Sequence, residues 1–290
     1  MKRSTIQHLR IPFSFFLLPV YLFALSLSYT VNLENAILVA IALHIFLYPA
    51  SNGYNSYFDR DKGSIGGVKK PLQVTVELYW VALIFDAIAL LIGLWIDVYF
   101  AMMLLIYGLV SKAYSHPSIR LKNRPYLGWL IAGLFQGYFT FLMSFMAINE
   151  LDPTALWHLP IQLPALLSSA LLWGSYPMTQ VYQHEEDKER GDITISLKLG
   201  ILGTFHFTAV TFGLANIGFI LFYGNYYGWI SSLGFQSALL PVLIYFFYWY
   251  IKVRKDNNKA NFEHTMRLNF ISSLMMNLFF GLFYIMNVLI

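Results

Sequence analysis

The sequence has no cysteine and little charge. Without cysteine the chain has no disulfide, no thiolate metal ligand and no cysteine nucleophile. Charged residues make up only 12% of the 290 residues and hydrophobic residues 58%, a balance that water-soluble domains of this length rarely reach. The composition therefore indicates an integral membrane protein in the lipid bilayer, with connections too short to form a separate soluble domain.

Nine apolar stretches are long enough to cross about 30 Å of hydrocarbon as helices. They are continuous rather than alternating, which argues against transmembrane strands. No small-residue cleavage site follows the first stretch, so we expect a membrane helix there and not a cleaved signal peptide. The sequence thus predicts an all-α, polytopic membrane protein with nine transmembrane helices, at about 11–30, 35–58, 76–96, 98–114, 125–148, 163–187, 202–223, 231–251 and 265–289.

Basic residues are missing from every second connection of this arrangement. With nine spans, all 19 lysines and arginines fall on one side of the membrane. By the positive-inside rule we expect that side, with the N-terminus and the active-site loops, to be cytoplasmic and the C-terminus to lie on the opposite side. Topology therefore accounts for the net charge of +4, and we expect no nucleic-acid partner.

A polar segment, NGYNSYFDRDKG at residues 52–63, ends the second stretch. At about 100° per residue, Asn52, Asn55 and Asp59 fall on one face of a helix, together with Ser56. The segment predicts a polar stripe at the end of a membrane helix.

A second segment, QVYQHEEDKERGD at residues 180–192, repeats this spacing 128 residues later. It places Gln180, Gln183, His184 and Asp187 at the matching positions, and we expect a second helix to end in the same stripe. Because the segments end spans 2 and 6, we predict one domain, 1–290, with two four-helix pseudo-repeats at about 11–114 and 125–251 and a ninth helix at about 265–289.

The two stripes favour a shared polar cavity. Taken singly, each is compatible with an ordinary helix end that meets water, but a carboxylate near hydrocarbon normally faces a cavity or a partner. Carboxylate and amide oxygens suit Mg²⁺, which often bridges to phosphate oxygens, whereas His184 is the only imidazole on either stripe. The surrounding lysines and arginines would complete a site for a diphosphate.

These features resemble the UbiA family of intramembrane prenyltransferases over nearly the whole chain. That family has nine transmembrane helices and two aspartate-rich motifs, on helices 2 and 6, which bind an isoprenyl diphosphate through Mg²⁺. The first motif corresponds to Asn55, Asp59 and Gly63, and N-S-Y-F-D resembles the N-D-Y-F-D of the branch that prenylates dihydroxynaphthoate. Three loops add to the resemblance: KKPL at 69–72, YSHPSIRLKNRPYLG at 114–128 and GDITISLKLG at 191–200.

The resemblance implies a Mg²⁺-dependent enzyme that ionises an isoprenyl diphosphate and transfers the prenyl group to a small aromatic or lipid acceptor. Asp59 and Asp187 are the expected catalytic residues. The expected metal ligands are Asn52, Asn55, Asp59, Gln183 and Asp187. The expected diphosphate-binding residues are Lys69, Lys70, Tyr114, Arg120, Lys122 and Lys188, although each cation could also be a loop charge that sets topology.

The chain departs from the family pattern at several motif positions. Ser56, Gly63 and Gln183 stand where aspartates are usual, so each motif keeps one carboxylate on its face. On a continuing helix Asp61 would point to the other side, whereas a helix that has already ended would free it. Asp61, Glu186 and Asp192 could then contribute ligands from loops.

Asp86 lies near the middle of the third stretch, with no basic residue expected in the same membrane layer. An intramembrane acid is a candidate functional residue. It could orient or deprotonate an acceptor or stabilise a carbocation, or it could be a protonated aspartate that bonds to a neighbouring helix. We therefore include Asp86 among the candidate catalytic residues.

Three other functions remain compatible with the sequence. A UbiA-type terpene cyclase would use the same motifs, with the cation captured by a double bond of the same molecule. A transporter would also have repeated helices and buried polar groups, although its site is expected at midplane. A non-catalytic protein on the same fold would explain the missing aspartates. The acceptor and the prenyl chain length are left open.

Overall fold

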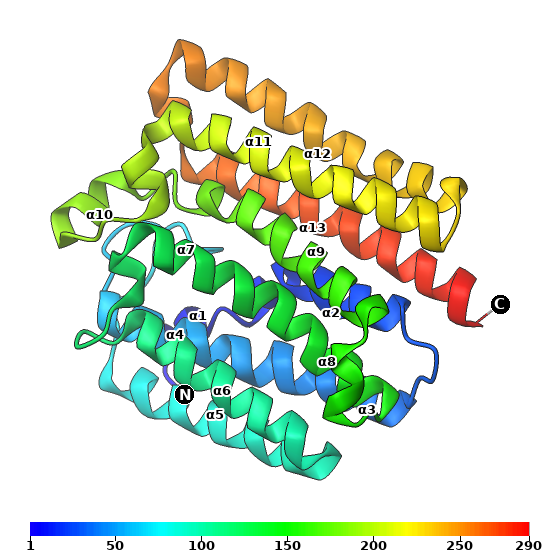
Figure 1. Ribbon diagram of the computed structural model, residues 1–290. Helices are drawn as coiled ribbons and strands as arrows, with labels where there is room; N and C mark the ends of the chain where they lie inside the picture. The colour runs from blue at the N-terminus through cyan, green and yellow to red at the C-terminus, as the bar shows by residue number, and fades with distance from the viewer. Residues whose placement is uncertain (290) are drawn as a thin grey trace.

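The computed structural model describes residues 1–289, and this part of the chain consists of helices and loops without a β-strand. The long helices run roughly side by side, as Figure 1 shows. The predicted all-α membrane fold is confirmed.

The first half of the chain forms two long helical segments and the pair α5–α6. A π-helical stretch, η2, joins α3 to α4 without a loop, and the 3₁₀ helix η1 joins α1 to α2. The helices are α1 (Arg3–Leu9), η1 (Ile11–Phe16), α2 (Leu18–Ser26), α3 (Leu33–Ile41), η2 (Ala42–Leu47), α4 (Tyr48–Asp59), α5 (Val76–Ile96) and α6 (Val98–Ser115).

The second half repeats the use of a π-helical joint, η4, between α7 and α8. Its helices are η3 (Leu121–Asn123), α7 (Pro125–Gly133), η4 (Leu134–Phe139), α8 (Thr140–Asn149), η5 (Pro153–Trp157), α9 (Leu159–Ser175), η6 (Tyr176–Thr179), α10 (His184–Arg190), α11 (Ile195–Tyr226), α12 (Trp229–Lys255), η7 (Asn257–Lys259), α13 (Phe262–Tyr284) and η8 (Ile285–Leu289). The division into two pseudo-repeats stays a prediction.

Eight helical segments of the described chain are long and apolar enough to cross a membrane. They correspond to the predicted spans 1–5 and 7–9. The sixth predicted span, 163–187, corresponds to α9, which has 17 residues and ends at Ser175. The count of nine spans therefore stays a prediction.

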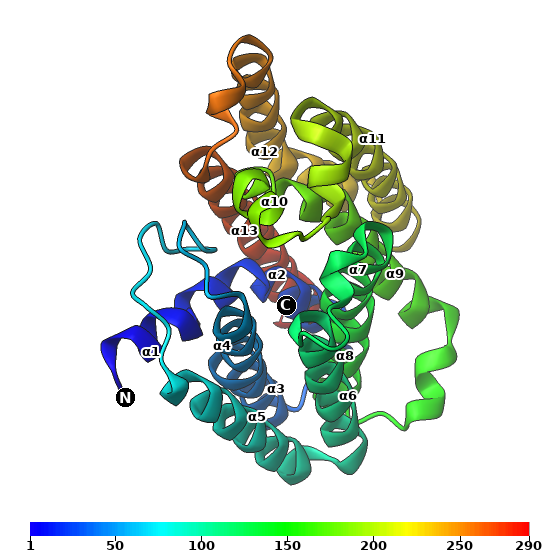
Figure 2. The same cartoon turned by 90° about the vertical axis from the view of Figure 1, so that its left-hand side faces the viewer.

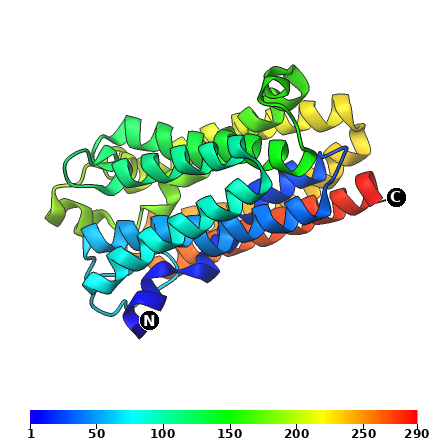
Figure 3. The same ribbon diagram turned by 90° about the horizontal axis from the view of Figure 1, so that it is seen from below.

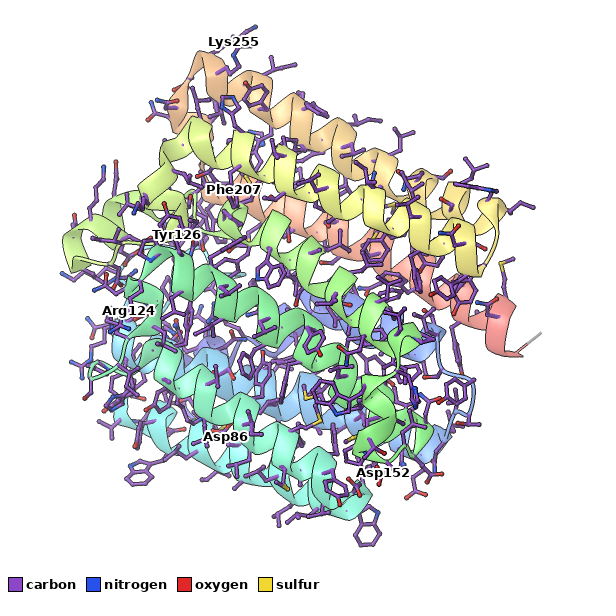
Figure 4. The ribbon with its side chains drawn as sticks, viewed as in Figure 1. Asp86, Arg124, Tyr126, Asp152, Phe207 and Lys255 are labelled. Carbon is purple, nitrogen blue, oxygen red and sulfur yellow. The ribbon has the colours of Figure 1, made fainter. Side chains whose placement is uncertain are left out.

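One end of the bundle carries the loops 60–75, 116–124, 180–194 and 256–261, and we call it the basic end. Arg124 and Lys255 lie at this end, while Asp152 lies at the opposite one (Figure 4). Figure 2 views the bundle along its helices from the basic end, with α10 facing the reader. Seen from below in Figure 3, the N-terminus lies towards the basic end and α13 runs away from it.

Aromatic residues fill the core towards the opposite end. Phe23 of α2 stacks on Phe280 of α13, with ring centroids 4.7 Å apart, and Phe219 of α11 stacks on Phe235 of α12 at 4.6 Å. All four side chains are almost fully buried. Stacked pairs of this kind add to the free energy gained by burial, so they stabilise the bundle at that end.

The joint η4 brings α9 unusually close. A Cβ atom on Gly137 would lie 2.5 Å from the backbone of Ser169, so only glycine fits. The Ser169 hydroxyl donates to the carbonyl of Gly133 at 2.8 Å and accepts the N–H of Tyr138, also at 2.8 Å. Because a π-bulge leaves backbone groups without their usual partners, this serine stabilises the joint.

Candidate functional site

The first polar segment forms the last turns of α4, as its periodicity predicts. The helix stays regular to Asp59 and ends because Arg60 adopts a left-handed conformation, with φ of 49°. The Asn55 side-chain amide donates to the Ser115 hydroxyl of α6 at 2.7 Å, and the Asn52 carbonyl accepts from Arg10 at 3.5 Å. The stripe therefore lies against α6 and the N-terminal segment.

The second segment does not end a membrane helix, and this prediction is wrong. α9 ends at Ser175, a 3₁₀ turn follows, and residues 180–183 separate it from the seven-residue helix α10. Pro177 lacks the N–H that a continuing helix would use, which favours a break here. Gln183 precedes α10 and Asp187 lies within it, while Gln180 accepts from the Ser196 N–H at 3.5 Å.

Loop cations join the two segments. Asp59 accepts hydrogen bonds from Lys122 and, at 3.5 Å, from Arg120. Arg120 also donates to both carboxylate oxygens of Asp192, at 2.7 and 2.8 Å, and Lys122 lies 3.7 Å from Asp192. The loop that follows α6 therefore bridges the end of α4 and the residue that follows α10.

Arg190 binds the remaining carboxylates. It forms ion pairs with Asp61, with Asp187 at 2.8 Å and with Asp192 at 3.3 Å. Because α4 has ended at Asp59, Asp61 turns inward, and its side chain is 6% exposed. Of the two alternatives for Asp61, the structure therefore supports the one in which the helix has already ended. We call the group of Asp59, Asp61, Asp187, Asp192, Arg120, Lys122 and Arg190 the charge cluster.

Asp187 and Asp192 differ in pKa because their surroundings differ. Burial raises the pKa of Asp187 to about 7, and the nearby charge of Asp192 adds to the shift, while the hydrogen bond from the Thr194 hydroxyl at 3.1 Å opposes it. Burial acts in the same direction on Asp192, but hydrogen bonds and charge from Arg120 and Lys122 prevail, and its pKa is lowered. The pKa of Arg120 is raised by its hydrogen bonds to Asp192.

A cavity of about 200 Å³ lies beside the charge cluster, between α4, α6, α7, η4 and η6. Asn52, Asn55 and Arg10 line its polar side, and Tyr107 and Phe135 its apolar side. Tyr114 and Tyr176 also line it and are joined by a hydrogen bond between their hydroxyl groups. The cavity therefore has a polar end and an aromatic wall.

The predicted diphosphate-binding residues divide into two groups. The structure brings Arg120 and Lys122 into the charge cluster and places Tyr114 on the cavity. Lys69 instead pairs with Glu263 at the start of α13, and both side chains are more than half exposed. Lys70 is exposed on the loop that follows α4, and Lys188 is exposed on α10.

Asp86 does not lie in the charge cluster. It forms an ion pair with Lys112 of α6, so the expectation that no basic residue shares its membrane layer is wrong. Lys112 also lies 5.1 Å from the ring of Tyr54, and neither residue lines the cavity. Figure 4 shows Asp86 on α5, well away from α10.

Glu186 connects α10 to the loop that follows α4. Its carboxylate accepts the backbone N–H groups of Lys62 at 2.8 Å and Gly63 at 3.2 Å. Glu186 was expected as a possible ligand from a loop. In the structure this carboxylate fastens α10 to the loop that follows α4.

Arg10, like Arg190, is a residue of this site that the sequence did not predict. It has φ of 50°, its guanidinium lies 5.3 Å from the ring of Phe13, and it lines the cavity. Its buried Nε has no hydrogen-bond partner among residues 1–289. The position of a cation directly before an apolar stretch was its only signal, and topology explained that equally well.

The donor set of the charge cluster suits a hard cation. Four carboxylates gather there, and the amides of Asn52 and Asn55 line the neighbouring cavity. Oxygen ligands of this kind are those that Mg²⁺ prefers. Within residues 1–289 no three carboxylate or imidazole groups converge as a ready-made metal site, since basic side chains stand between the acids.

The comparisons with known proteins agree with one another. Residues 16–274 match the UbiA prenyltransferase family. A 1,4-dihydroxy-2-naphthoate octaprenyltransferase from Bacillus subtilis (strain 168) is 25% identical, over 91% of this chain and 84% of the relative.

Solved structures of UbiA homologues share the fold at 19% sequence identity. The homologue from Archaeoglobus fulgidus bound to DMAPP and Mg²⁺ has a TM-score of 0.68, with 97% of this chain and 99% of that chain covered. The apo structure of the homologue from Aeropyrum pernix K1 has a TM-score of 0.72, with 94% and 98% covered.

Proposed function

The chain belongs to the UbiA prenyltransferase family and is an intramembrane prenyltransferase, and on that premise we propose that it ionises an isoprenyl diphosphate at the charge cluster with Mg²⁺. The observation that carries this proposal is that four aspartates and three cations adjoin a cavity with a polar end and an aromatic wall. We further propose that the basic end faces the cytoplasm, because lysine and arginine concentrate there.

Mg²⁺, when bound, would stabilise negative charge on the leaving diphosphate. Asp59 and Asp187 are our main ligand candidates, because one ends α4 and the other lies on α10. The ion pairs of Asp192 with Arg120 and with Arg190 connect the two sides. Asp61 and Asp192 are further candidates, since both are held in the same cluster. Asn52 and Asn55 would supply amide oxygens from the cavity side, and Gln183 would do so from the start of α10.

Arg120, Lys122 and Arg10 are our candidates for direct contacts with the diphosphate. Arg120 and Lys122 neutralise the aspartates in the structure, and they would turn to phosphate oxygens when a metal ion takes their place. Arg10 has an unpartnered Nε and lines the polar end of the cavity. Guanidinium groups suit phosphate because their N–H groups match two oxygens at once.

The aromatic wall would protect the reaction that follows. The C1–O bond of the isoprenyl diphosphate breaks, the electron pair leaves with the diphosphate, and an allylic cation remains. The rings of Tyr107, Tyr114 and Phe135 would stabilise this cation through their π-faces and keep water away. An acceptor nucleophile then supplies the electron pair of the new bond and releases a proton.

We propose an aromatic acceptor of the dihydroxynaphthoate type. The Bacillus subtilis relative is named for that acceptor. The N-S-Y-F-D order of the first motif resembles the same branch. The cavity of about 200 Å³ has a polar rim for hydroxyl groups and an apolar wall for rings.

The test is Mg²⁺-dependent release of diphosphate by the purified protein in nanodiscs, with and without an aromatic acceptor. We expect Asp59→Asn and Asp187→Asn each to lose at least about 100-fold, as removal of a group that stabilises transition-state charge does. Glu185→Gln is the matched control, because Glu185 is exposed on α10 and the exchange is also from carboxylate to amide.

Full activity in both aspartate variants would show that the site assignment is wrong. A cyclic product formed without acceptor would identify a terpene cyclase instead. Substrate flux across liposomes without diphosphate release would identify a transporter. The charge cluster speaks against transport, because it lies at one end of the bundle rather than at its midplane.

A further inference from the structure

A second cavity, of about 220 Å³, lies at the basic end between α12, η7 and α13. Its lining residues are Lys252, Lys259, Asn261, Glu263, His264 and Arg267. None of them belongs to the charge cluster or lines the first cavity. We call it the α12–α13 pocket, and the proposed prenyl transfer leaves it unexplained.

The lining of this pocket carries three cations and one carboxylate. That carboxylate, Glu263, is drawn to Lys69 of the loop that follows α4. Lys259 has only a distant partner, Asp256, at 3.9 Å, and Lys252 and Arg267 have no carboxylate within 4.0 Å among residues 1–289. Cations that only set topology would be more stable far apart, because like charges repel. The convergence of Lys252, Lys259 and Arg267 on one pocket therefore indicates an anionic ligand.

Buried aromatic contacts hold the pocket in shape. Trp249 is fully buried, and its indole N–H donates to the Lys259 carbonyl at 2.7 Å, which fixes the turn between α12 and α13. His264 stacks on the same indole, with ring centroids 5.8 Å apart, and its Nδ1 bonds to the Tyr245 hydroxyl at 2.6 Å. A pocket with rigid walls loses little entropy when a ligand binds.

A lipid-facing surface leads from this pocket along α12. Ile244, Tyr248 and Ile251 are each about half exposed or more, and their spacing places them on one side of the helix. The Lys252 ammonium lies over the Tyr248 ring at 4.5 Å, at the top of this side. A ligand that fits both parts has an anionic head for the pocket and an apolar tail for the helix surface.

We propose that the α12–α13 pocket binds the headgroup phosphate of an anionic phospholipid, with the acyl chains lying along α12. Basic pockets between membrane helices suit such headgroups, because cations and phosphate attract each other strongly near the low-dielectric bilayer. The ligand differs from the isoprenyl diphosphate in place and in chemistry, so the two proposals can fail independently.

Native mass spectrometry of the detergent-purified full chain, titrated with phosphatidylglycerol or with phosphatidylcholine, tests this proposal. We expect phosphatidylglycerol to bind at least about tenfold more tightly, because the three cations of the pocket lining attract its net negative charge, whereas phosphatidylcholine has no net charge. The double variant Lys252→Gln and Arg267→Gln should lose this preference. Inorganic phosphate, added in a third arm, should compete only weakly, because it lacks the acyl chains.

The matched control is Arg254→Gln with Lys255→Gln, which removes the same charge from the same end of α12 but leaves the pocket lining unchanged. An equal loss in both double variants, or equal binding of the two lipids, would show that the pocket is not a lipid site. Binding of inorganic phosphate without preference for phosphatidylglycerol would also overturn the proposal. Lys259 lies in an exposed turn, where an exchange does not endanger folding. Lys259→Gln should weaken binding of phosphatidylglycerol a few-fold, whereas the control Lys255→Gln should not.

Discussion

The two halves of the charge cluster differ in how the chain carries them. Asp59 ends α4, the last part of a helical segment that runs from Leu33, and it shares the rigidity of a membrane helix. Asp187 lies on α10, a helix of seven residues that is separated from α9 by a break and from α11 by Gly191. Similar chemical groups are therefore supplied once by a fixed element and once by a short detached one.

The contacts between the halves show how the detached element is positioned. Glu186 accepts two backbone N–H groups from the loop after α4, and Arg190 binds Asp61 from the same loop. Both contacts are made with loop residues 61–63 and not with a membrane helix. α10 therefore takes its position from hydrogen bonds and an ion pair with the loop that follows α4. Changes in charge should for this reason affect the position of α10 more than that of α4.

The largest expected effect comes from the carboxylate that both halves share. Asp192 accepts two hydrogen bonds from Arg120, and its side chain is 1% exposed. Asp192→Asn should destabilise the fold by about 3 kcal/mol, because it removes a buried carboxylate that Arg120, Lys122 and Arg190 share. Diphosphate release should fall by about 100-fold, since those cations lose their position.

Thermal unfolding and a diphosphate assay would measure the two effects of Asp192→Asn. Asp256→Asn is the control, because Asp256 is a half-exposed aspartate at the basic end outside the charge cluster. Unchanged stability would mean that Asp192 does not hold the two halves together.

The next prediction concerns Asp187 on α10, which should make Mg²⁺ binding depend on pH. The pKa of Asp187 is about 7, so this carboxyl is protonated below that pH and must lose a proton to bind Mg²⁺. Affinity for Mg²⁺ should therefore fall by up to about tenfold per pH unit below 7. Isothermal titration calorimetry at several pH values would measure it, and Asp187→Asn should remove the dependence.

The raised pKa of Asp187 has the opposite effect on the stability of the metal-free protein, which increases as pH falls. A folded-state pKa above the unfolded value favours the protonated carboxyl, so the stability gained from Asp187 is full below about pH 4 and is lost as pH rises through about 7. Unfolding midpoints of the wild type minus those of Asp187→Asn isolate this contribution. A difference that rises with pH would contradict the assignment.

A smaller effect is expected from the contact that fastens α10. Glu186→Gln keeps the shape of the side chain but replaces charged acceptors by one amide oxygen, and it should cost about 1–2 kcal/mol in the docking of α10. Hydrogen exchange of residues 184–190 should become faster. Glu189→Gln, on the exposed side of the same helix, should leave exchange unchanged.

The smallest effect concerns how α10 ends. Gly191 has φ of 74°, and an added Cβ would meet no atom within 4 Å, so Gly191→Ala suffers only from backbone strain. We expect about 1 kcal/mol of destabilisation, measured by thermal unfolding. A much larger loss would mean that α10 supports the whole fold rather than the site alone.

The sequence predicted the membrane helices and the stripe on α4, because hydrophobic runs and helical spacing are local properties. It failed at α10, where Pro177 was the available signal but the polar residues 180–187 fit helical spacing equally well. The direction of Asp61 stayed undecided because it depends on where α4 ends, and α4 ends where Arg60 adopts a left-handed conformation. The Asp86–Lys112 pair depends on how α5 packs on α6, and no periodicity within one helix reveals that.

Three arginines at the basic end, Arg10, Arg60 and Arg120, share a left-handed backbone conformation that glycine would adopt without strain. Arg10 lines the cavity and Arg120 belongs to the charge cluster, so at these two positions a guanidinium stands where the backbone alone would favour glycine. Glycine at Arg60, outside both, should relieve the strain, raise the unfolding temperature and leave activity intact. Glycine at Arg120 would relieve the same strain but leave the buried Asp192 carboxylate without two hydrogen bonds, so it should lose both stability and activity. The strained backbone is therefore kept at Arg120 for its guanidinium, and Arg60 is the position where heat resistance can be gained without loss of activity.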